Sequence, residues 1–394
     1  MRIANGRVRA WSLAAVGVAG LASVTSTGAG RSAGTACSPS AVILESPREN
    51  SREVQVKALN DRGDVVGFAD SDGGSGPVHA ILWKGGKVAD AVDLGLLPGY
   101  VSSEAYGVND DRVVFGLLYD AQERTFPFRW EDGRMTILRG PSGRIQQASG
   151  NPGEGGRNAI NRRGEMTWTL IVAGKPRAVR WSRGGKAALL PRLPGHAWSW
   201  AFGINDGGVV SGWSRKLPNE DGEENPVLWT RAGKVVPLKT IPGRADGIAE
   251  ATNRSGLTVG YLGNQTATEP ESDQFAVWRT RTAAPLLMGP VRPNVIAEFV
   301  DVNDRGEAAG MSAALNPQTG FKLAQPMIWR TGWTSVRTLR VPAASQRANP
   351  VLITNLNDVN NRGAIVGNVF GLSGRDYSKL RQIDPVLWTC AFGR

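Results

Sequence analysis

The sequence has little of what usually carries catalysis or metal binding. It contains two histidines, His79 and His196, in separate parts of the chain without a partner pattern, and two cysteines. Two cysteines exclude a cysteine-rich metal site, and no His-Glu-x-x-His, Gly-x-Ser-x-Gly or phosphate-loop motif is present. No stretch sustains the apolar period of a helix. We therefore assign no catalytic, cofactor-binding or metal-binding residue.

Long apolar runs are also scarce. Three arginines precede the one candidate, residues 11–24, and small residues follow it through Ala36. The run is short for a membrane span, so we expect a signal peptide over residues 1–36, no transmembrane span and a secreted mature chain. An uncleaved anchor is the alternative. Cleavage lowers the formal charge from +11 to +7, because four arginines are the only charged residues of the segment.

What the sequence has in abundance is one unit, repeated seven times at a period near 50 residues. Each unit has an Asn, a Gly three positions later, a β-branched run with a second Gly, and a Trp about twenty residues beyond. The asparagines are Asn60, Asn109, Asn161, Asn205, Asn253, Asn303 and Asn360. The tryptophans are Trp83, Trp130, Trp181, Trp229, Trp278, Trp329 and Trp388. Arg112 replaces the first Gly in unit two, and Trp168 replaces the second in unit three.

Each unit reads as four short antiparallel strands. In unit two, 103–109, 113–118, 125–130 and 135–138 alternate with turns, and Asp132-Gly133 is a strong hairpin signal. Four such strands make one propeller blade, and seven units predict one all-β domain over 37–394, a seven-bladed β-propeller. The Asn is expected to start a turn, the second Gly to allow close backbone approach, and the Trp to wedge between blades.

The unit resembles the HAF-type bacterial extracellular repeat. The first copy shows this best, in residues 59–67 (Leu-Asn-Asp-Arg-Gly-Asp-Val-Val-Gly), then 80–83 (Ala-Ile-Leu-Trp) and 93–99 (Asp-Leu-Gly-Leu-Leu-Pro-Gly). The resemblance spans 58–388 and implies a secreted or surface propeller-like protein. It implies no activity and no catalytic residues.

The last unit lacks room for a fourth strand after Trp388, whereas Ala41-Val42-Ile43-Leu44 precedes the first unit as a spare strand. We expect this spare strand to pair with the strand ending in Trp388 and to complete the last blade, which removes two sheet edges. Cys37 and Cys390 then flank the pairing and are expected to form a disulfide in an oxidising compartment. A lipid-modified Cys37 is the alternative.

Charge separates between the two ends of the predicted propeller. The turns after the first and third strands lie at one end, and their windows hold seventeen Lys or Arg against seven Asp or Glu. The long loops at the other end hold thirteen acids against nine bases. A basic end attracts polyanions, although basic turns also serve solubility alone.

Candidate ligand-binding residues follow from this charge and from one aromatic cluster. The basic candidates are Arg162, Arg163, Arg183 and Lys186, and the aromatic ones are Trp198, Trp200 and Trp213. The tryptophans either stack on sugar rings or are buried between blades. Two acidic loops, 70–74 and 219–224, raise a calcium hypothesis, but neither has a full ligand set, and solvated acidic loops are the competing explanation.

These features favour a monomeric, secreted, non-enzymatic binding module for an anionic cell-wall polymer or polysaccharide. Nucleic acid fits the sign of the charge but not the export signal. The alternative is a polysaccharide lyase or glycoside hydrolase with its site in the central funnel, because propellers can assemble carboxylate pairs from different blades.

Overall fold

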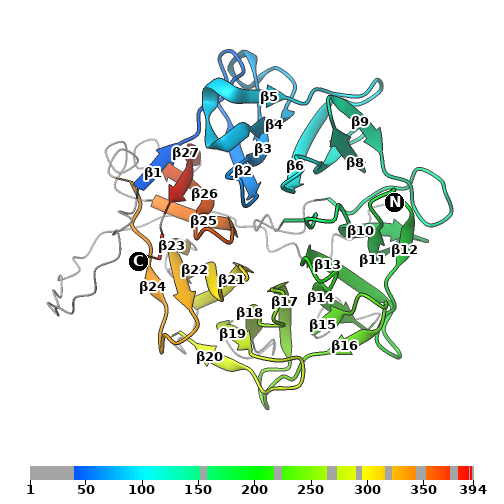
Figure 1. The fold of residues 1–394 in the computed structure, drawn as a ribbon, viewed down its shortest axis with the longest axis vertical. Helices are drawn as coiled ribbons and strands as arrows, with labels where there is room; N and C mark the ends of the chain where they lie inside the picture. The colour runs from blue at the N-terminus through cyan, green and yellow to red at the C-terminus, as the bar shows by residue number, and fades with distance from the viewer. Residues whose placement is uncertain are drawn as a thin grey trace, which may run out of the picture.

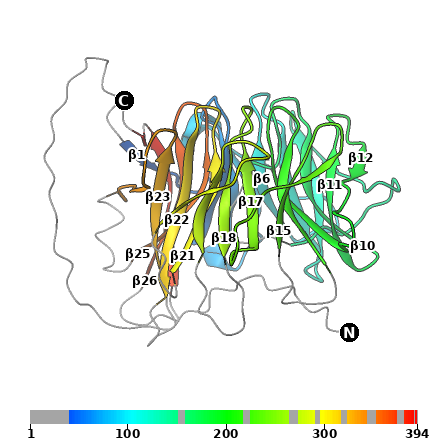
Figure 2. The same ribbon diagram turned by 90° about the horizontal axis from the view of Figure 1, so that it is seen from below.

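Seven antiparallel sheets stand around a common axis (Figure 1), and in side view their strands run along that axis (Figure 2). The computed structural model describes residues 40–150, 158–216, 224–263, 273–289, 295–315, 322–342, 352–372, 380–389 and 391–392. In these ranges, helix is limited to three short 3-10 turns, at Asp72–Gly74, Lys84–Gly86 and Val88–Asp90, and no helix could cross a membrane. The predicted seven-bladed β-propeller is confirmed.

Within each blade the strands follow the chain from the axis outward, and each pairs with the next. Blade 1 contains β2 (Val54–Leu59), β3 (Val65–Ala69), β4 (His79–Trp83) and β5 (Ala91–Asp93), and blade 2 contains β6 (Ser102–Val108), β7 (Val114–Tyr119), β8 (Thr125–Glu131) and β9 (Arg134–Ile137). Blade 3 contains β10 (Met166–Val172), β11 (Lys175–Trp181) and β12 (Ala187–Leu189), and blade 4 contains β13 (Trp198–Ile204), β14 (Val210–Arg215), β15 (Asn225–Trp229) and β16 (Val235–Pro237). Blade 5 contains β17 (Asp246–Thr252), β18 (Thr258–Gly263), β19 (Gln274–Trp278) and β20 (Leu286–Met288), and blade 6 contains β21 (Val295–Val302), β22 (Glu307–Leu315), β23 (Lys322–Arg330) and β24 (Arg337–Thr338). Blade 7 contains β25 (Leu352–Val359), β26 (Ile365–Leu372) and β27 (Leu380–Thr389).

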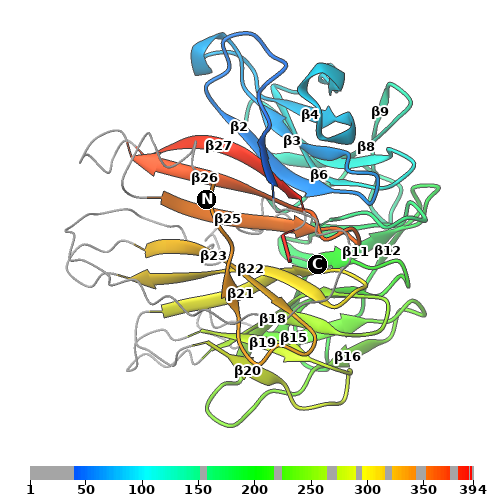
Figure 3. The ribbon, with the colours of Figure 1, turned by 60° about the vertical axis from the view of Figure 1, so that its left-hand side comes forward.

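The ring closes through the first strand of the chain. β1 (Ser40–Ile43) is the outer strand of blade 7 and pairs antiparallel with β27, with Ser40 opposite Thr389 and Ile43 opposite Val386. Figure 3 shows the orange and red strands of the last blade beside the blue strands of the first. The predicted closing strand is therefore confirmed. Cys37 and Cys390 lie outside the described residues, so the disulfide stays a prediction.

Blade 3 departs from the other six. Its described part has three strands, and in place of an inner strand Ile160 makes a single bridge to Met166 while Ala148 bridges Leu170. This blade also carries Trp168 where the others have Gly. The indole packs against Tyr106 and Phe115 of blade 2, with ring centroids 5.0 and 5.3 Å away. An indole fits here because no described strand runs along this part of β10.

In the six blades that have a glycine seven positions after the Asn, a close backbone approach requires it. A Cβ on Gly67 would lie 1.8 Å from the carbonyl oxygen of Gln55, and one on Gly212 would lie 1.9 Å from that of Trp200. In both blades the inner strand has a register shift opposite this glycine, which brings its backbone over the second strand. Any side chain would push the two strands apart.

The recurring tryptophans fill the interfaces between blades, as expected. Trp83, Trp181, Trp229 and Trp278 are completely buried, each in a cluster that draws on two adjacent blades. The indole N–H of Trp229, for example, donates to the Pro191 carbonyl at 2.6 Å, in the segment that connects blade 3 to blade 4. Burial of the ring and satisfaction of its one donor together hold neighbouring blades in place.

Candidate functional site

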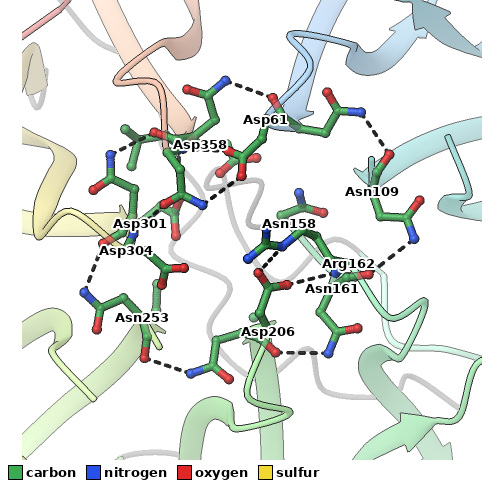
Figure 4. Close-up of a pocket in the computed structure, with 18 of the residues that line it drawn as sticks. Asp61, Asn109, Asn158, Asn161, Arg162, Asp206, Asn253, Asp301, Asp304 and Asp358 are labelled. Atoms are coloured by element: carbon green, nitrogen blue, oxygen red, sulfur yellow. Dashed lines mark hydrogen bonds and ion pairs between the residues drawn. The ribbon is translucent and has the colours of Figure 1, made fainter. Parts of the chain in front are cut away.

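At one end of the axis, the seven repeat asparagines form a closed ring, which we call the asparagine belt. Each side-chain Nδ2 donates to the backbone carbonyl of the asparagine in the next blade (Figure 4). The Nδ2–O distances are 2.9 Å from Asn60 to Asn109, 3.3 Å to Asn161, 3.0 Å to Asn205, 2.8 Å to Asn253, 3.0 Å to Asn303, 2.8 Å to Asn360 and 2.8 Å back to Asn60.

The other end of each amide starts the turn, as predicted. Asn60 Oδ1 accepts the backbone N–H groups of Arg62 and Asp64, both at 2.9 Å, and Asn303 Oδ1 accepts those of Arg305 and Glu307, both at 3.0 Å. One side chain thus fixes a turn in its own blade and binds the next blade. Sequence reasoning found the first role and missed the second.

A second ring, the aspartate belt, lies beside the first. It consists of the residue after each repeat asparagine: Asp61, Asp110, Arg162, Asp206, Arg254, Asp304 and Asn361. Where this residue is Asp or Asn, its Oδ1 accepts the backbone N–H of the preceding blade, as from Asp61 to Asp110 at 3.0 Å and from Asn361 to Asp61 at 2.7 Å. Arginine cannot accept a hydrogen bond, so the chain of bonds breaks at Arg162 and Arg254.

The two belts line a cavity of about 120 Å³ on the axis. Arg162 reaches into it, and its Nε donates to Asp206 Oδ2 at 2.5 Å (Figure 4). The hydrogen bond to Asp206, with the charges of Asp61 and Asp110 nearby, raises the pKa of Arg162. The cavity therefore already holds a cation, supplied by the chain itself.

Deeper in the cavity, Asp301 and Asp358 form a carboxyl pair. Burial, and then the charge and hydrogen bond of Asp301, raise the pKa of Asp358 well above its usual range. Asp358 Oδ2 accepts the Leu59 N–H at 2.8 Å and Asp301 Oδ2 the Val359 N–H at 3.0 Å. A shared proton thus lets two carboxyl groups hold blades 6, 7 and 1 together.

The basic residues of this end gather on the outer half of the blades. We define the basic rim as the exposed Lys and Arg at the turns between third and fourth strands: Lys87, Arg134, Arg183, Lys186, Arg231, Lys234, Arg279, Arg281 and Arg330. Of these nine side chains, only that of Arg183 lies within 4 Å of a carboxylate of the described chain, with Arg183 Nη2 and Asp111 Oδ2 3.9 Å apart. The predicted basic end thus has an outer ring of cations around a centre rich in carboxylates.

The seven predicted ligand-binding residues fall into four places. Arg162 lies in the axial cavity, whereas Arg163 pairs with Glu165 at 2.6 Å in its own blade. Arg183 and Lys186 belong to the rim. The three tryptophans, Trp198, Trp200 and Trp213, lie in β13 and β14 toward the opposite end of the propeller. Trp213 is buried, Trp198 and Trp200 are half-buried, and Trp200 stacks on Trp213 with ring centroids 5.7 Å apart. Their binding roles stay predictions.

The loop at 70–74 has a structural explanation. Asp70 Oδ1 accepts hydrogen bonds from Ser51 Oγ at 2.7 Å and from the backbone N–H groups of Arg52 and Glu53 at 2.7 and 2.9 Å. This oxygen secures the chain entering β2. In the described part of the chain, no three His, Cys, Asp or Glu side chains are grouped to hold a metal ion. Of the second acidic loop, 219–224, residues 219–223 lie outside the described residues.

Comparison with known proteins finds distant similarity to solved structures. No protein-family model and no curated protein matches the chain. Among solved structures, a streptogramin B lyase is 10% identical at a TM-score of 0.46, over 89% of this chain and 96% of that one. Virginiamycin B lyase from Staphylococcus aureus is 10% identical at 0.48, over 89% and 99%. Oligogalacturonate lyase from Vibrio parahaemolyticus is 10% identical at 0.48, over 86% and 90%. Matches this distant carry no argument about activity.

Proposed function

We propose that this propeller is an exported binding module that holds an extended polyanion, an acidic polysaccharide or anionic cell-wall polymer, against its basic rim. The observation that carries the proposal is the rim itself: nine exposed cations spread over six blades, with a single distant carboxylate partner. Two exposed carboxylates, Asp90 and Asp132, lie in the same turns, whereas the belt carboxylates accept hydrogen bonds near the axis, away from a polymer on the rim. The HAF resemblance and the signal segment support export.

A polymer suits this arrangement better than a small ion. Exposed cations at separate turns attract an anion weakly one by one, because water and salt screen each of them. A chain of negative charges contacts several turns at once, and long-range attraction also speeds its approach. Binding should therefore be tight at low ionic strength and should weaken steeply as salt is added.

The test is titration of the protein with polygalacturonate and with dextran sulfate at low and moderate salt. Reversing four rim charges, Arg231→Glu, Lys234→Glu, Arg279→Glu and Arg281→Glu, should weaken binding of both polymers by at least about tenfold. The matched control is Arg52→Glu, because Arg52 is equally exposed at the opposite end. Equal losses in the rim variant and the control would contradict a rim site, as would binding that is insensitive to salt.

The enzyme alternative is tested on the same samples. Incubation of the protein with polygalacturonate, followed by assays for unsaturated products and for new reducing ends, separates binding from cleavage. The binding proposal expects neither product. An unsaturated product would identify a lyase, and new reducing ends without unsaturation would identify a hydrolase.

Export and the Cys37–Cys390 disulfide belong to the same proposal. In support of the disulfide, Ser40 and Thr389 are directly paired, with their hydroxyl oxygens 2.5 Å apart. In the sequence, Cys37 comes three residues before Ser40 and Cys390 directly follows Thr389. Intact mass of the exported protein should correspond to a chain beginning near Cys37 and should rise by two hydrogens on reduction. A lipid-sized mass increment at Cys37 would support the alternative.

A further inference from the structure

One turn of blade 6 carries a tryptophan that the repeat does not explain. The turn joins β23 to β24, and Trp333 lies in it, four residues after the repeat tryptophan. The other six units have Lys, Arg, Gly, Gly, Thr and Phe at this place, in chain order. Because six blades form without a tryptophan here, the fold alone does not require one.

The turn is anchored to its blade at the same end as the belts. The N–H of Thr331 donates to the Gly306 carbonyl at 2.8 Å, in the turn between β21 and β22. The N–H of Trp333 donates to the Arg330 carbonyl at 3.0 Å, and the Trp333 carbonyl accepts the indole N–H of Trp329, also at 3.0 Å. The half-buried Trp333 ring packs against the core clusters on both sides of blade 6. Backbone hydrogen bonds and burial therefore fix its position.

Two arginines lie on this ring. The guanidinium carbon of Arg337 is 3.9 Å from the ring centroid of Trp333, and that of Arg330 is 5.0 Å from it. The two guanidinium groups can therefore be no farther apart than these two distances together. A guanidinium in contact with an aromatic ring keeps its N–H donors free at its edges. The indole thus orients two cations and leaves their hydrogen-bond donors available.

Neither arginine has a partner for these donors. Arg330 and Arg337 are exposed, and within the described chain neither side chain forms an ion pair or a hydrogen bond. Glu307, directly opposite Arg330 in the sheet, accepts from Arg305 at 2.6 Å and from Asn303 at 2.8 Å instead. Two like charges held on one ring repel each other, and an oxyanion that contacts both would relieve this repulsion.

The same turn of blade 5 provides a comparison. Arg279 and Arg281 give it the same charge, and both are exposed without an ion-pair partner in the part of the chain that the structure describes. Thr282 replaces the tryptophan, so no indole orients these two side chains. An anion that binds them must order them first, which has an entropic cost. In blade 6 the two side chains are already oriented.

We propose that Arg330, Trp333 and Arg337, together called the blade-6 clamp, form the principal oxyanion subsite of the rim. The clamp binds a carboxylate or sulfate group of an acidic saccharide through the N–H edges of its two guanidinium groups. It rests on the proposed binding function, since Arg330 belongs to the basic rim. The clamp goes beyond that function in one respect: it holds a short oligosaccharide, whereas the other rim cations need a polymer.

The test is calorimetric titration with trigalacturonate, sulfated maltotriose and neutral maltotriose at low salt. Wild type should bind the two anionic trisaccharides and not maltotriose, and the tighter of the two identifies the preferred oxyanion. Arg330→Gln/Arg337→Gln should weaken both by about tenfold or more, because hydrogen bonds to charged groups are the strong ones. The charge-matched Arg279→Gln/Arg281→Gln variant should weaken them by no more than about twofold, through long-range attraction alone.

Substitution of the ring separates orientation from charge. Trp333→Leu keeps both arginines, yet it should weaken trigalacturonate binding several-fold, because the guanidinium groups lose the surface that orients them. Trp333→Phe keeps an aromatic face and should lie between the Leu variant and wild type. Thermal melting identifies the variants that fold as wild type does. A folded Leu variant with the affinity of wild type would overturn the role of the ring.

The remaining outcomes distinguish the clamp from the rim. Binding of polygalacturonate by wild type without binding of either anionic trisaccharide would overturn the clamp and leave the rim. Equal losses in the two double-arginine variants would do the same. Failure of wild type to bind any anionic probe, polymer or trisaccharide, would overturn the rim itself and the clamp with it. Maltotriose binding as tight as that of trigalacturonate would contradict an oxyanion site.

Discussion

Two zones at the same end of the propeller use similar residues in opposite ways. Near the axis, Arg162 is bound to Asp206, and every repeat asparagine is committed to two blades at once. On the rim, Arg231 and Lys234 are exposed without an ion-pair partner in the described chain. The axial zone therefore supports the fold and the rim is available to a ligand. Changes near the axis should act on stability, and changes on the rim should act on binding.

The largest effect is expected where two backbones touch near the axis. A Cβ on Gly260 would lie 2.0 Å from the Ile248 carbonyl oxygen, so Gly260→Ala must displace β17. We expect a loss of about 3–5 kcal/mol in the free energy of unfolding, measured by urea denaturation. The matched rim variant is Gly233→Ala, which has φ +81° but nothing within 4 Å, and should lose about 1–2 kcal/mol. Similar losses in both would contradict the close approach.

The asparagine belt comes next. Asn303→Ala removes the bonds to Asn360 and Glu307, both 2.8 Å, and leaves two backbone N–H groups without their acceptor. We expect a loss of about 2–4 kcal/mol. Asn253 has Leu257 at the position of Glu307, so Asn253→Asp keeps the Oδ1 acceptor, loses the donor to the Asn303 carbonyl and isolates the contact between blades. A belt that serves only the turn would leave the Asp variant as stable as wild type.

The carboxyl pair should make stability depend on pH. Because the folded pKa of Asp358 is raised, its contribution is fully present below the unfolded value near 4 and is lost as pH rises toward the folded value. Asp358→Asn keeps both hydrogen bonds without the shared proton, so it should be the more stable protein at pH 7 and should lack this decline. Thermal melting from pH 4 to 8 measures the difference.

Asp64 is the control of opposite sign. Although burial acts to raise it, hydrogen bonds from Arg112 and Asn60 hold the pKa of Asp64 below its usual value. Its contribution is present above the unfolded pKa and is lost as pH falls, so Asp64→Asn should destabilise the protein at pH 7 and much less near pH 3. Parallel pH profiles for the two variants would contradict the opposite shifts.

The smallest effect on stability is expected on the rim. Lys234→Glu should change the free energy of unfolding by less than about 0.5 kcal/mol, because an exposed charge without a partner contributes little. The same substitution should still weaken polygalacturonate binding at low salt. A destabilisation as large as that of Asn303→Ala would remove the distinction between the two zones.

Sequence patterns predicted the architecture because each repeat residue has a local reason. The turn-forming asparagines, the Asp132-Gly133 hairpin with φ +49° and +80°, and the spare strand at residues 41–44 could all be read from one unit or from the chain ends. The reduced inner strand of blade 3 was not predicted, although Trp168 in place of Gly marked that unit as different.

The belts could not be predicted, because local turn chemistry already accounted for the asparagines. Their second role depends on seven side chains meeting at one radius, which appears only after the ring is closed. A signal was available in the next residue, which is Asp or Asn in five units. The charge count had the same weakness. The count of charges at this end gave Asp61 and Lys234 equal weight, although Asp61 lines the axial cavity and Lys234 lies on the rim.

The closing strand has a consequence for the order in which the protein is made. β1 is the first described strand to be synthesised, and its partner, β27, is the last. Until β27 has been synthesised, β1 has no partner strand and blade 7 lacks both of its outer strands. A chain that ends before Leu380 therefore leaves β1 and one edge of β26 without a partner strand, although Asn360 is still present to close the asparagine belt. Truncated products of this kind should aggregate or be degraded, so only the completed polypeptide accumulates.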